Sequence, residues 1–234
     1  MFRILTVCTG NICRSPLAES ILRLDLDPEV FSVSSAGIMA VEGGLVPKPQ
    51  LRIAETVGVT DLEQHRARQI TTGKIGISDL ILGLSRGHRK RIARLEPTAL
   101  SRLFTMREFA HLAQHVTPDD IEQQLEGDAS PLHAAVAAVN AKRGMVLPVL
   151  SGTDLDVVDP FRQSRSVYKE SRDQLVPATE VTAAFLQGVV DIFGGKELLP
   201  EPRTLTEPDI VSQGIPRVPD FPKRAELRRQ GMLK

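Results

Sequence analysis

The stretch Val7-Cys8-Thr9-Gly10-Asn11-Ile12-Cys13-Arg14-Ser15-Pro16 decides the fold, because a strand enters it and a helix leaves it. The apolar residues 2–7 predict the strand. Ser15-Pro16 is typical of a helix start, with Ser15 as the N-cap and Pro16 at the first helical position. Backbone N–H groups and the positive end of the helix converge on the loop between them, so the loop is an anion site.

Two side chains indicate what this anion site does. Cys8 opens the loop and Arg14 follows six residues later. A thiol that faces converging N–H groups, a helix N-terminus and a guanidinium is favoured as a thiolate nucleophile. The planar guanidinium matches two oxygens of a phosphate, and the Ser15 hydroxyl can donate to the thiolate as well as cap the helix. The alternative is a passive buried cysteine in a strand-to-helix turn.

The backbone of the loop also carries a prediction. We expect Gly10 and Asn11 to take the left-handed conformation that such a loop requires. The chain contains no GxxxxGK[ST] segment, which excludes a loop that binds nucleoside triphosphates in that way.

Strand and helix patterns alternate through the first half of the chain. Residues 31–37 predict a second strand, residues 49–57 a helix, and the nearly continuous apolar run 79–84 a strand buried on both faces. This alternation predicts an α/β fold with a layered parallel sheet.

The second half is mostly helical in character. Residues 106–148 are rich in helix formers and predict a helical insertion or cap, with helices over 106–115, 121–125 and 132–142. A long helix is expected over 164–193, interrupted at Pro177 because proline cannot donate the helical hydrogen bond.

Length, composition and net charge limit the domain organisation and exclude several classes of protein. The 234 residues predict one domain over 1–195, and residues 196–234, which hold six of the 16 prolines and end in basic residues, predict a tail. Lys+Arg and Asp+Glu number 29 each, so the net basic field of a nucleic-acid binder is absent. Two cysteines exclude a disulfide scaffold and a four-thiolate zinc site. We expect a soluble, cytoplasmic protein with no nucleic-acid partner and no membrane span, because no apolar run approaches the ~18–20 residues of a membrane helix.

Residues 8–16 resemble, nearly letter for letter, the phosphate-binding loop of the low-molecular-weight protein-tyrosine-phosphatase family. Three further segments are similar to segments of that family: Ser35-Ala36-Gly37, His65-Arg66-Ala67-Arg68-Gln69-Ile70-Thr71 and Asp159-Pro160-Phe161. The resemblance covers about residues 2–105 and 150–193. It implies three α/β/α layers around a four-stranded parallel sheet, with the loop at the carboxyl end of the first strand, where ligands bind in such sheets.

The resemblance also implies a mechanism on phosphomonoesters. Cys8 would attack phosphorus to give a phosphocysteine, and Asp159 would protonate the leaving oxygen and then deprotonate the hydrolytic water. Arg14 would hold the phosphate together with the loop residues Thr9, Gly10, Asn11, Ile12, Cys13 and Ser15. No metal or cofactor is called for, because the guanidinium and the amides stabilise the charge.

Several residues have supporting roles by the same resemblance. Asn11, Ser15, Ser35 and His65 match a hydrogen-bond network that holds the loop and the thiolate. Cys13 matches a second loop cysteine that can bond the nucleophile reversibly under oxidation, and a passive packed thiol is the alternative.

Some assignments stay open. Asp154 and Asp156 lie close to Asp159 in sequence and are alternative general acids. His88, His111, His115 and His133 are interpreted as surface or helix residues without a metal-ligand pattern. The five Arg and Lys residues of 86–94 form a solvated helix face that, near the cleft, could meet acidic substrates.

The predicted cleft departs from the family pattern. Val41, Phe161 and Arg162 are the expected cleft residues, and family members that bind phosphotyrosine usually carry more aromatic rings there. Members specific for phosphoarginine tend to have Thr where Ile12 stands, so Ile12 favours the tyrosine type. The expected partners are a phosphotyrosine-containing protein and inorganic phosphate or another oxyanion in the loop.

Two other functions remain as alternatives. An arsenate reductase of the same fold needs further cysteines downstream, and none follows Cys13. A catalytically weak regulatory or binding module is the other alternative, against which the intact Cys8, Arg14 and Asp159 argue.

Overall fold

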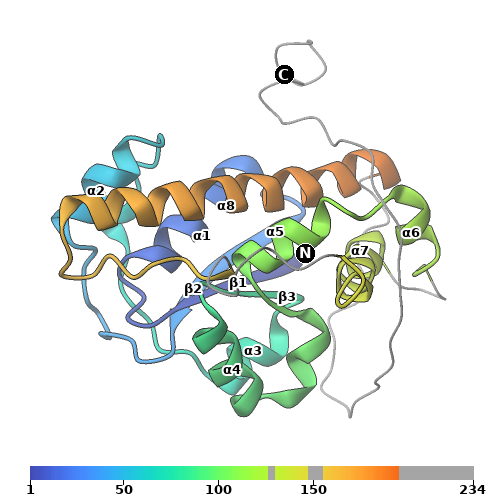
Figure 1. The fold of residues 1–234 in the computed structure, drawn as a ribbon, viewed down its shortest axis with the longest axis horizontal. Coiled ribbons are helices and arrows are strands. Elements are labelled where there is room, and N and C mark those ends of the chain that lie inside the picture. Colours follow the sequence, from blue (N-terminus) through green and yellow to red (C-terminus); the bar gives the residue numbers. More distant parts are fainter. Residues whose placement is uncertain (126–129, 147–154, 195–234) are drawn as a thin grey trace.

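A four-stranded parallel sheet forms the centre of the computed structural model, which describes residues 1–125, 130–146 and 155–194 (Figure 1). The strands are β1 Phe2–Cys8, β2 Phe31–Gly37, β3 Leu80–Gly83 and β4 Leu103–Thr105. Their order in the sheet is β2-β1-β3-β4, and every neighbouring pair is parallel. β1 is therefore a central strand, and its carboxyl end lies between those of β2 and β3.

Helices cover both faces of this sheet and confirm the predicted α/β/α architecture. The α-helices are α1 Arg14–Asp25, α2 Lys48–Glu55, α3 Thr72–Ile77, α4 Arg86–Leu95, α5 Met106–Ala113, α6 Pro118–Glu122, α7 Pro131–Ala141 and α8 Arg165–Phe193, and the 3-10 helices are Leu62–Gln64 and Pro97–Arg102. α1 and α8 lie on one side of the sheet and α3 and α4 on the other (Figure 1).

The alternation of side chains along β1 explains the two layers. Successive residues of a strand point to opposite faces. Ile4 belongs to the large core that α1, α5, α7 and α8 complete, whereas Leu5 and Val7 belong to a smaller core shared with Ile75 of α3 and Ile92 of α4. Both faces of β1 are buried, and this places its carboxyl end inside the molecule.

Helix α1 begins two residues earlier than the Ser-Pro pair predicts. Cys13 takes the N-cap position without a side-chain hydrogen bond, and Pro16 is the third residue of the helix. Proline is tolerated there because the N–H groups of the first turn have no partner within the helix. The prediction of Ser15 as the N-cap is therefore wrong, since its hydroxyl points to the sulfur of Cys8 instead.

Helix α8 runs without interruption through Pro177, so the predicted break is also wrong. Leu175, Ala178 and Thr179 on either side of the proline are buried, and this packing holds the helix axis where one backbone hydrogen bond is missing. The helix is long and apolar enough to cross a membrane by length and composition alone. Half of its most apolar window is buried against the rest of the protein, as expected of a core helix.

The stretch 106–146 forms helices α5, α6 and α7 close to the predicted positions. α5 and α7 contribute Phe109, Leu132 and Val136 to the same core as α8, so this stretch is built into the main body of the protein. Residues 147–148 of the predicted insertion and the predicted tail 196–234 lie outside the described residues. The division into a domain over 1–195 and a tail remains a prediction.

The end of β2 is pressed against the loop that follows β1. Gly37 pairs with Cys8 in the sheet, and a Cβ atom on Gly37 would lie 2.5 Å from the Thr9 carbonyl oxygen. Real Cβ atoms do not approach a backbone oxygen that closely. Only glycine allows β2 to run this near to the anion loop.

We therefore expect Gly37→Ala to displace the loop, with a stability loss of about 1–3 kcal/mol from overpacking and a loss of phosphatase activity. Gly73→Ala in α3 is the matched control, because the nearest atom to its new Cβ would be 3.9 Å away. Thermal unfolding and turnover of nitrophenyl phosphate measure both effects. A Gly37→Ala protein as stable and active as Gly73→Ala would contradict this interpretation.

Candidate active site

The loop from Cys8 to Arg14 turns sharply at Asn11. Asn11 has a left-handed backbone with φ 55°, as predicted. Gly10 does not share it, so that half of the prediction is wrong. Asparagine tolerates this conformation better than most residues, so the single turn at Asn11 is enough to reverse the chain.

Two hydrogen bonds converge on the sulfur of Cys8, which is buried at the end of β1. The Asn11 N–H donates to it over 3.3 Å and the Ser15 hydroxyl over 3.0 Å. Donors to sulfur stabilise the thiolate relative to the thiol. The geometry thus suits a nucleophilic cysteine and not a passive one.

The side chain of Asn11 organises the loop around this sulfur. Its amide N–H groups donate to Ser15 Oγ over 3.0 Å and to Ser35 Oγ over 2.8 Å, and its Oδ1 accepts from the Arg68 N–H over 2.8 Å. Its backbone oxygen lies 2.9 Å from His65 Nε2. The four residues of the predicted supporting network, Asn11, Ser15, Ser35 and His65, therefore meet in the structure.

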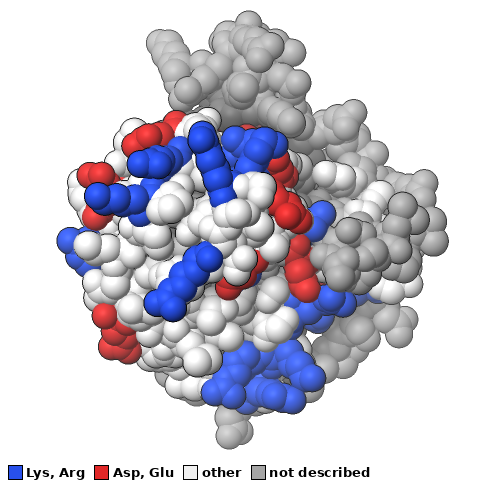
Figure 2. Space-filling view, turned by 60° about the vertical axis from the view of Figure 1, so that its left-hand side comes forward, with Lys and Arg blue, Asp and Glu red and all other residues white. Residues whose placement is uncertain are grey.

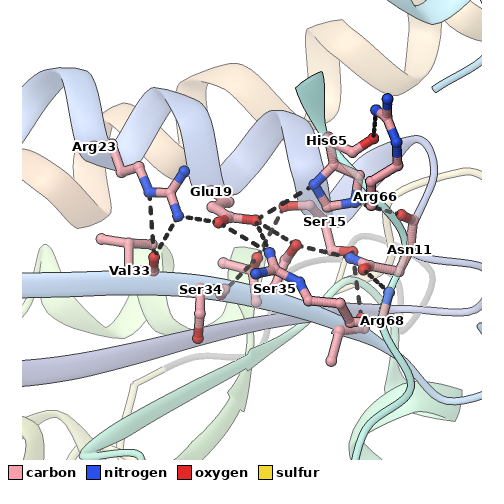
Figure 3. A network of polar contacts seen from close by, with 12 residues as sticks. Asn11, Ser15, Glu19, Arg23, Val33, Ser34, Ser35, His65, Arg66 and Arg68 are labelled. Carbon is pink, nitrogen blue, oxygen red and sulfur yellow. Dashed lines mark hydrogen bonds and ion pairs between the residues drawn. The ribbon is translucent and has the colours of Figure 1, made fainter. Parts of the chain in front are cut away.

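Glu19 completes this network and was missed by the sequence analysis (Figure 3). It lies on α1, is 2% exposed, and accepts from Ser35 Oγ. Arg23 and Arg68 neutralise its charge from two sides. The signal in the sequence is one acidic residue in a helical segment, 15–22, that is otherwise apolar or small.

The carboxylate of Glu19 sets the direction of every hydrogen bond in this chain. A carboxylate only accepts, so Ser35 donates to Glu19 and its oxygen accepts from Asn11. The Arg68 backbone N–H fixes the Asn11 oxygen, so the Asn11 amide donates to Ser15. The Ser15 hydroxyl then donates to the Cys8 sulfur at 3.0 Å, with the Ala36 carbonyl oxygen as a more distant acceptor at 3.4 Å. Burial, the largest cause, lowers the pKa of His65, and its Nδ1 lies 3.9 Å from Glu19.

Arg14 is buried beside the loop with one donor unused. Its Nη1 donates to the Val157 carbonyl oxygen over 2.9 Å, and its Nη2 pairs with Asp159. Among the described residues, its buried Nε has no hydrogen-bond partner. A buried guanidinium N–H without an acceptor is costly, and an oxyanion in the loop would satisfy it.

Asp159 lies at the open side of the site, with 49% of its side chain exposed. Its Oδ1 accepts from the Phe161 N–H over 3.2 Å, which holds the Asp-Pro turn. Of the two alternative acids, Asp156 binds the backbone N–H of Arg86 over 2.7 Å and its guanidinium, and Asp154 lies outside the described residues. Asp159 is the carboxylate that contacts Arg14.

The predicted cleft residues surround the loop unevenly. A Cβ on Gly10 would lie 3.4 Å from Ile12 and 3.9 Å from Val41, so these two side chains flank the turn. Phe161 is 38% exposed, and the Arg162 guanidinium lies 5.1 Å from its ring centre. The rim of the site therefore consists of two aliphatic side chains, one aromatic ring and one cation.

The second cysteine, Cys13, is buried behind the loop. Burial, followed by the neighbouring Cys8, raises the pKa of the Cys13 thiol to about 12, so it stays protonated. Tyr168 lies beside it, and burial raises the pKa of that phenol to about 12 as well. The role of Cys13 as a reversible redox partner remains a prediction.

His88 is a helix residue, which is one of the two predicted alternatives, and it is buried. It lies buried on the inner face of α4, with its Nε2 3.0 Å from Thr9 Oγ1 and its Nδ1 3.0 Å from Ser85 Oγ. Burial, helped by the nearby Arg14 charge, lowers the pKa of His88 to about 4, so the ring is neutral at pH 7. His88 ties α4 to the anion loop.

A metal centre finds no support in the part of the chain that the structure describes. No group of three or more His, Cys, Asp or Glu side chains there could hold a metal ion.

Comparison with known proteins agrees with this geometry. The family model described as "Low molecular weight phosphotyrosine protein phosphatase" matches residues 3–147. A protein-arginine-phosphatase of Geobacillus stearothermophilus is 28% identical over 186 residues, covering 80% of this chain and 97% of that protein. A probable low molecular weight protein-tyrosine-phosphatase of Ralstonia nicotianae is 34% identical over 138 residues, covering 59% and 91%.

A solved structure extends the similarity to the fold. The YwlE arginine phosphatase from Geobacillus stearothermophilus superposes with a TM-score of 0.60 at 25% identity, over 84% of this chain and 99% of that one. The matched family model and the shared fold place the chain in the class of phosphatases. Within that class the chain belongs to the low-molecular-weight phosphotyrosine protein phosphatase family, and it is a phosphomonoester hydrolase of that family.

The role of Glu19 can be tested by removing only its charge. Gln at this position can donate to Ser35 and so reverse the chain of hydrogen bonds that ends at Cys8. We expect Glu19→Gln to slow alkylation of Cys8 by iodoacetamide at pH 6 and to lower turnover of nitrophenyl phosphate at least tenfold. It should also destabilise the fold by about 1–3 kcal/mol, the usual cost of a broken buried hydrogen bond.

Glu180→Gln is the matched control, because it makes the same change on the exposed face of α8. Equal alkylation rates in the two variants would show that Glu19 supports the fold and not the thiolate.

Proposed function

We propose that this protein hydrolyses phosphotyrosine in proteins through a phosphocysteine intermediate. The observation that carries the proposal is the buried Arg14 Nε, which has no partner in the described part of the chain, together with a cysteine sulfur that receives two hydrogen bonds. A phosphate in the loop would accept from that N–H and present its phosphorus to Cys8.

The residues suggest two chemical steps. In the first, the Cys8 thiolate attacks phosphorus, the S–P bond forms, the P–O bond to tyrosine breaks, and protonated Asp159 gives its proton to the leaving oxygen. In the second, Asp159 takes a proton from water, the water oxygen bonds to phosphorus, and the S–P bond breaks to release phosphate. The loop amides and Arg14 stabilise the charge in both steps.

The ion pair between Arg14 and Asp159 fits this sequence. The Asp159 carboxylate accepts from Arg14 Nη2. A phosphate dianion competes for the same donor, so its binding would release Asp159 from Arg14. Half of the Asp159 side chain is exposed, so it has room to turn toward the leaving group.

Two observations help to choose between phosphotyrosine and phosphoarginine as the substrate. The wall formed by Ile12 and Val41, with Phe161 at the rim, is apolar and suits an aryl ring. The similarity to arginine phosphatases favours phosphoarginine as the second candidate.

A side-by-side assay separates these candidates. We expect hydrolysis of a phosphotyrosine peptide to exceed that of matched phosphoarginine and phosphoserine peptides at least tenfold in kcat/KM. Phosphate release from equal concentrations of each peptide measures this. Cys8→Ser is the control: it should abolish turnover yet still bind vanadate. Faster hydrolysis of the phosphoarginine peptide would replace our proposal with the second candidate.

A second assay tests the general acid. Proton donation typically contributes ~10²–10⁴-fold, and it matters most for a basic leaving group. Asp159→Asn should therefore slow phosphotyrosine, whose leaving phenol has a pKa of ~10, far more than nitrophenyl phosphate. Rates with both substrates measure the difference, and Asp156→Asn is the matched control. If both substrates slow equally in Asp159→Asn, the residue holds the loop and donates no proton.

A further inference from the structure

Helix α4 presents a row of basic side chains to solvent. Arg86, Lys90 and Arg94 are spaced four residues apart, so they share one face of the helix, and Arg91 lies beside them. All four are exposed, whereas His88 and Ile92 on the opposite side are buried. The helix contains no acidic residue. We call Arg86, Lys90, Arg91 and Arg94 the α4 basic face.

Most of this charge is not neutralised within the protein. Arg86 pairs with Asp156. Lys90, Arg91 and Arg94 form no ion pair with any other residue that the structure describes. Figure 2 shows a cluster of basic side chains without acidic neighbours at its lower edge, where α4 lies in Figure 1. The chain as a whole has a net charge of zero, so this is a local concentration of charge.

The α4 basic face begins at the active site. His88 of the same helix contacts Thr9 of the anion loop, with 3.0 Å between His88 Nε2 and Thr9 Oγ1. Arg86 binds Asp156, three residues before Asp159. The first turn of α4 therefore borders the segment that supplies the general acid.

The length of this face fits a short stretch of substrate. At 1.5 Å per residue, the eight steps from Arg86 to Arg94 span about 12 Å. An extended peptide advances ~3.3 Å per residue, so about four residues would run along the face.

We propose that the α4 basic face binds acidic residues that flank the phosphorylated residue of the substrate protein. This inference rests on the proposed function, because it names the sequence context in which that site acts. Carboxylates of an extended chain would pair with Lys90, Arg91 and Arg94 while the phosphate occupies the loop. The enzyme would thereby prefer phosphorylated residues in acidic segments.

Charge and composition favour a polypeptide over a nucleic acid as the occupant. A nucleic-acid surface usually combines a basic field over the whole domain with aromatic side chains that stack on bases. The α4 basic face lies within a single helix, and α4 contains no Phe, Tyr or Trp.

The test measures binding to the Cys8→Ser protein, which should hold a phosphopeptide without turning it over. Three fluorescent peptides are compared, each with three variable positions before the phosphotyrosine and three after it. The first has Glu at the three positions before it, the second has Glu at the three positions after it, and the third has Gln at all six. We expect one Glu peptide to bind about tenfold more tightly than the Gln peptide at low salt, which is ~1.4 kcal/mol and within reach of two or three exposed ion pairs. The preference should shrink at 0.5 M salt, because screening shortens the range of these charges.

Charge reversal on the helix provides the control. Lys90→Glu/Arg94→Glu should remove the preference for Glu and leave turnover of nitrophenyl phosphate by the Cys8 enzyme unchanged. Lys48→Glu/Arg52→Glu on α2 makes the same change of charge at the same spacing between exposed residues, and it should keep the preference.

Each outcome has one meaning. Equal binding of the Glu and Gln peptides, or a preference that survives Lys90→Glu/Arg94→Glu, overturns the inference. A single-stranded oligonucleotide is a further probe. If Lys90→Glu/Arg94→Glu loses binding to this oligonucleotide while its binding of the Glu peptide is unchanged, the face is a nucleic-acid site and the inference is overturned. A wild-type enzyme that fails to hydrolyse nitrophenyl phosphate contradicts the proposed function, and the peptide binding ratio still reports on the α4 basic face.

Discussion

The hydrogen bonds of Asn11 are the constraint on which the rest of the site depends. Its left-handed backbone turns the chain so that its own N–H faces the Cys8 sulfur, and its side chain fixes Ser15, Ser35 and the Arg68 backbone around that turn. An anion loop must bring several N–H groups to one point without acceptors of its own. Hydrogen bonds to β2 and to the segment 65–70 hold the loop in that shape from outside.

Buried charge is arranged so that each group has a partner or a task. Glu19 has two arginines and a hydroxyl, and its carboxylate orients the hydroxyl protons that end at Cys8. Arg14 pairs with a carbonyl oxygen and a carboxylate, and its Nε has no hydrogen-bond partner among the residues that the structure describes. Desolvated charges are costly unless hydrogen-bonded, so the unused N–H marks where a ligand belongs. The fold thus holds the loop ready for an oxyanion.

Helix α4 connects the site with the protein surface. Its inner face carries the neutral His88 that contacts Thr9, and its outer face carries four cations. Rim residues such as Val41 and Phe161 offer little aromatic surface, so recognition of the phosphorylated side chain alone is limited. Charge beside the cleft offers a further source of selectivity, at a distance that an extended substrate can bridge.

Local pattern and short spacing were enough to predict the strand-loop-helix unit and the parallel α/β order, which the structure confirms. They also made Cys8 and Arg14 the candidate site residues, and the family resemblance added Asp159. The sequence by itself failed where packing decides. Pro177 lies inside a continuous helix because its neighbours are buried. Ser15 is not the N-cap of α1, and its hydroxyl donates to the Cys8 sulfur. His88 and Arg68 reach the loop from segments distant in the chain, and Glu19 of α1 is joined to it through Ser35 of β2, so no local pattern encodes these contacts. Only the tertiary structure, through burial and hydrogen-bond geometry, shows which polar side chains face the site and which face solvent.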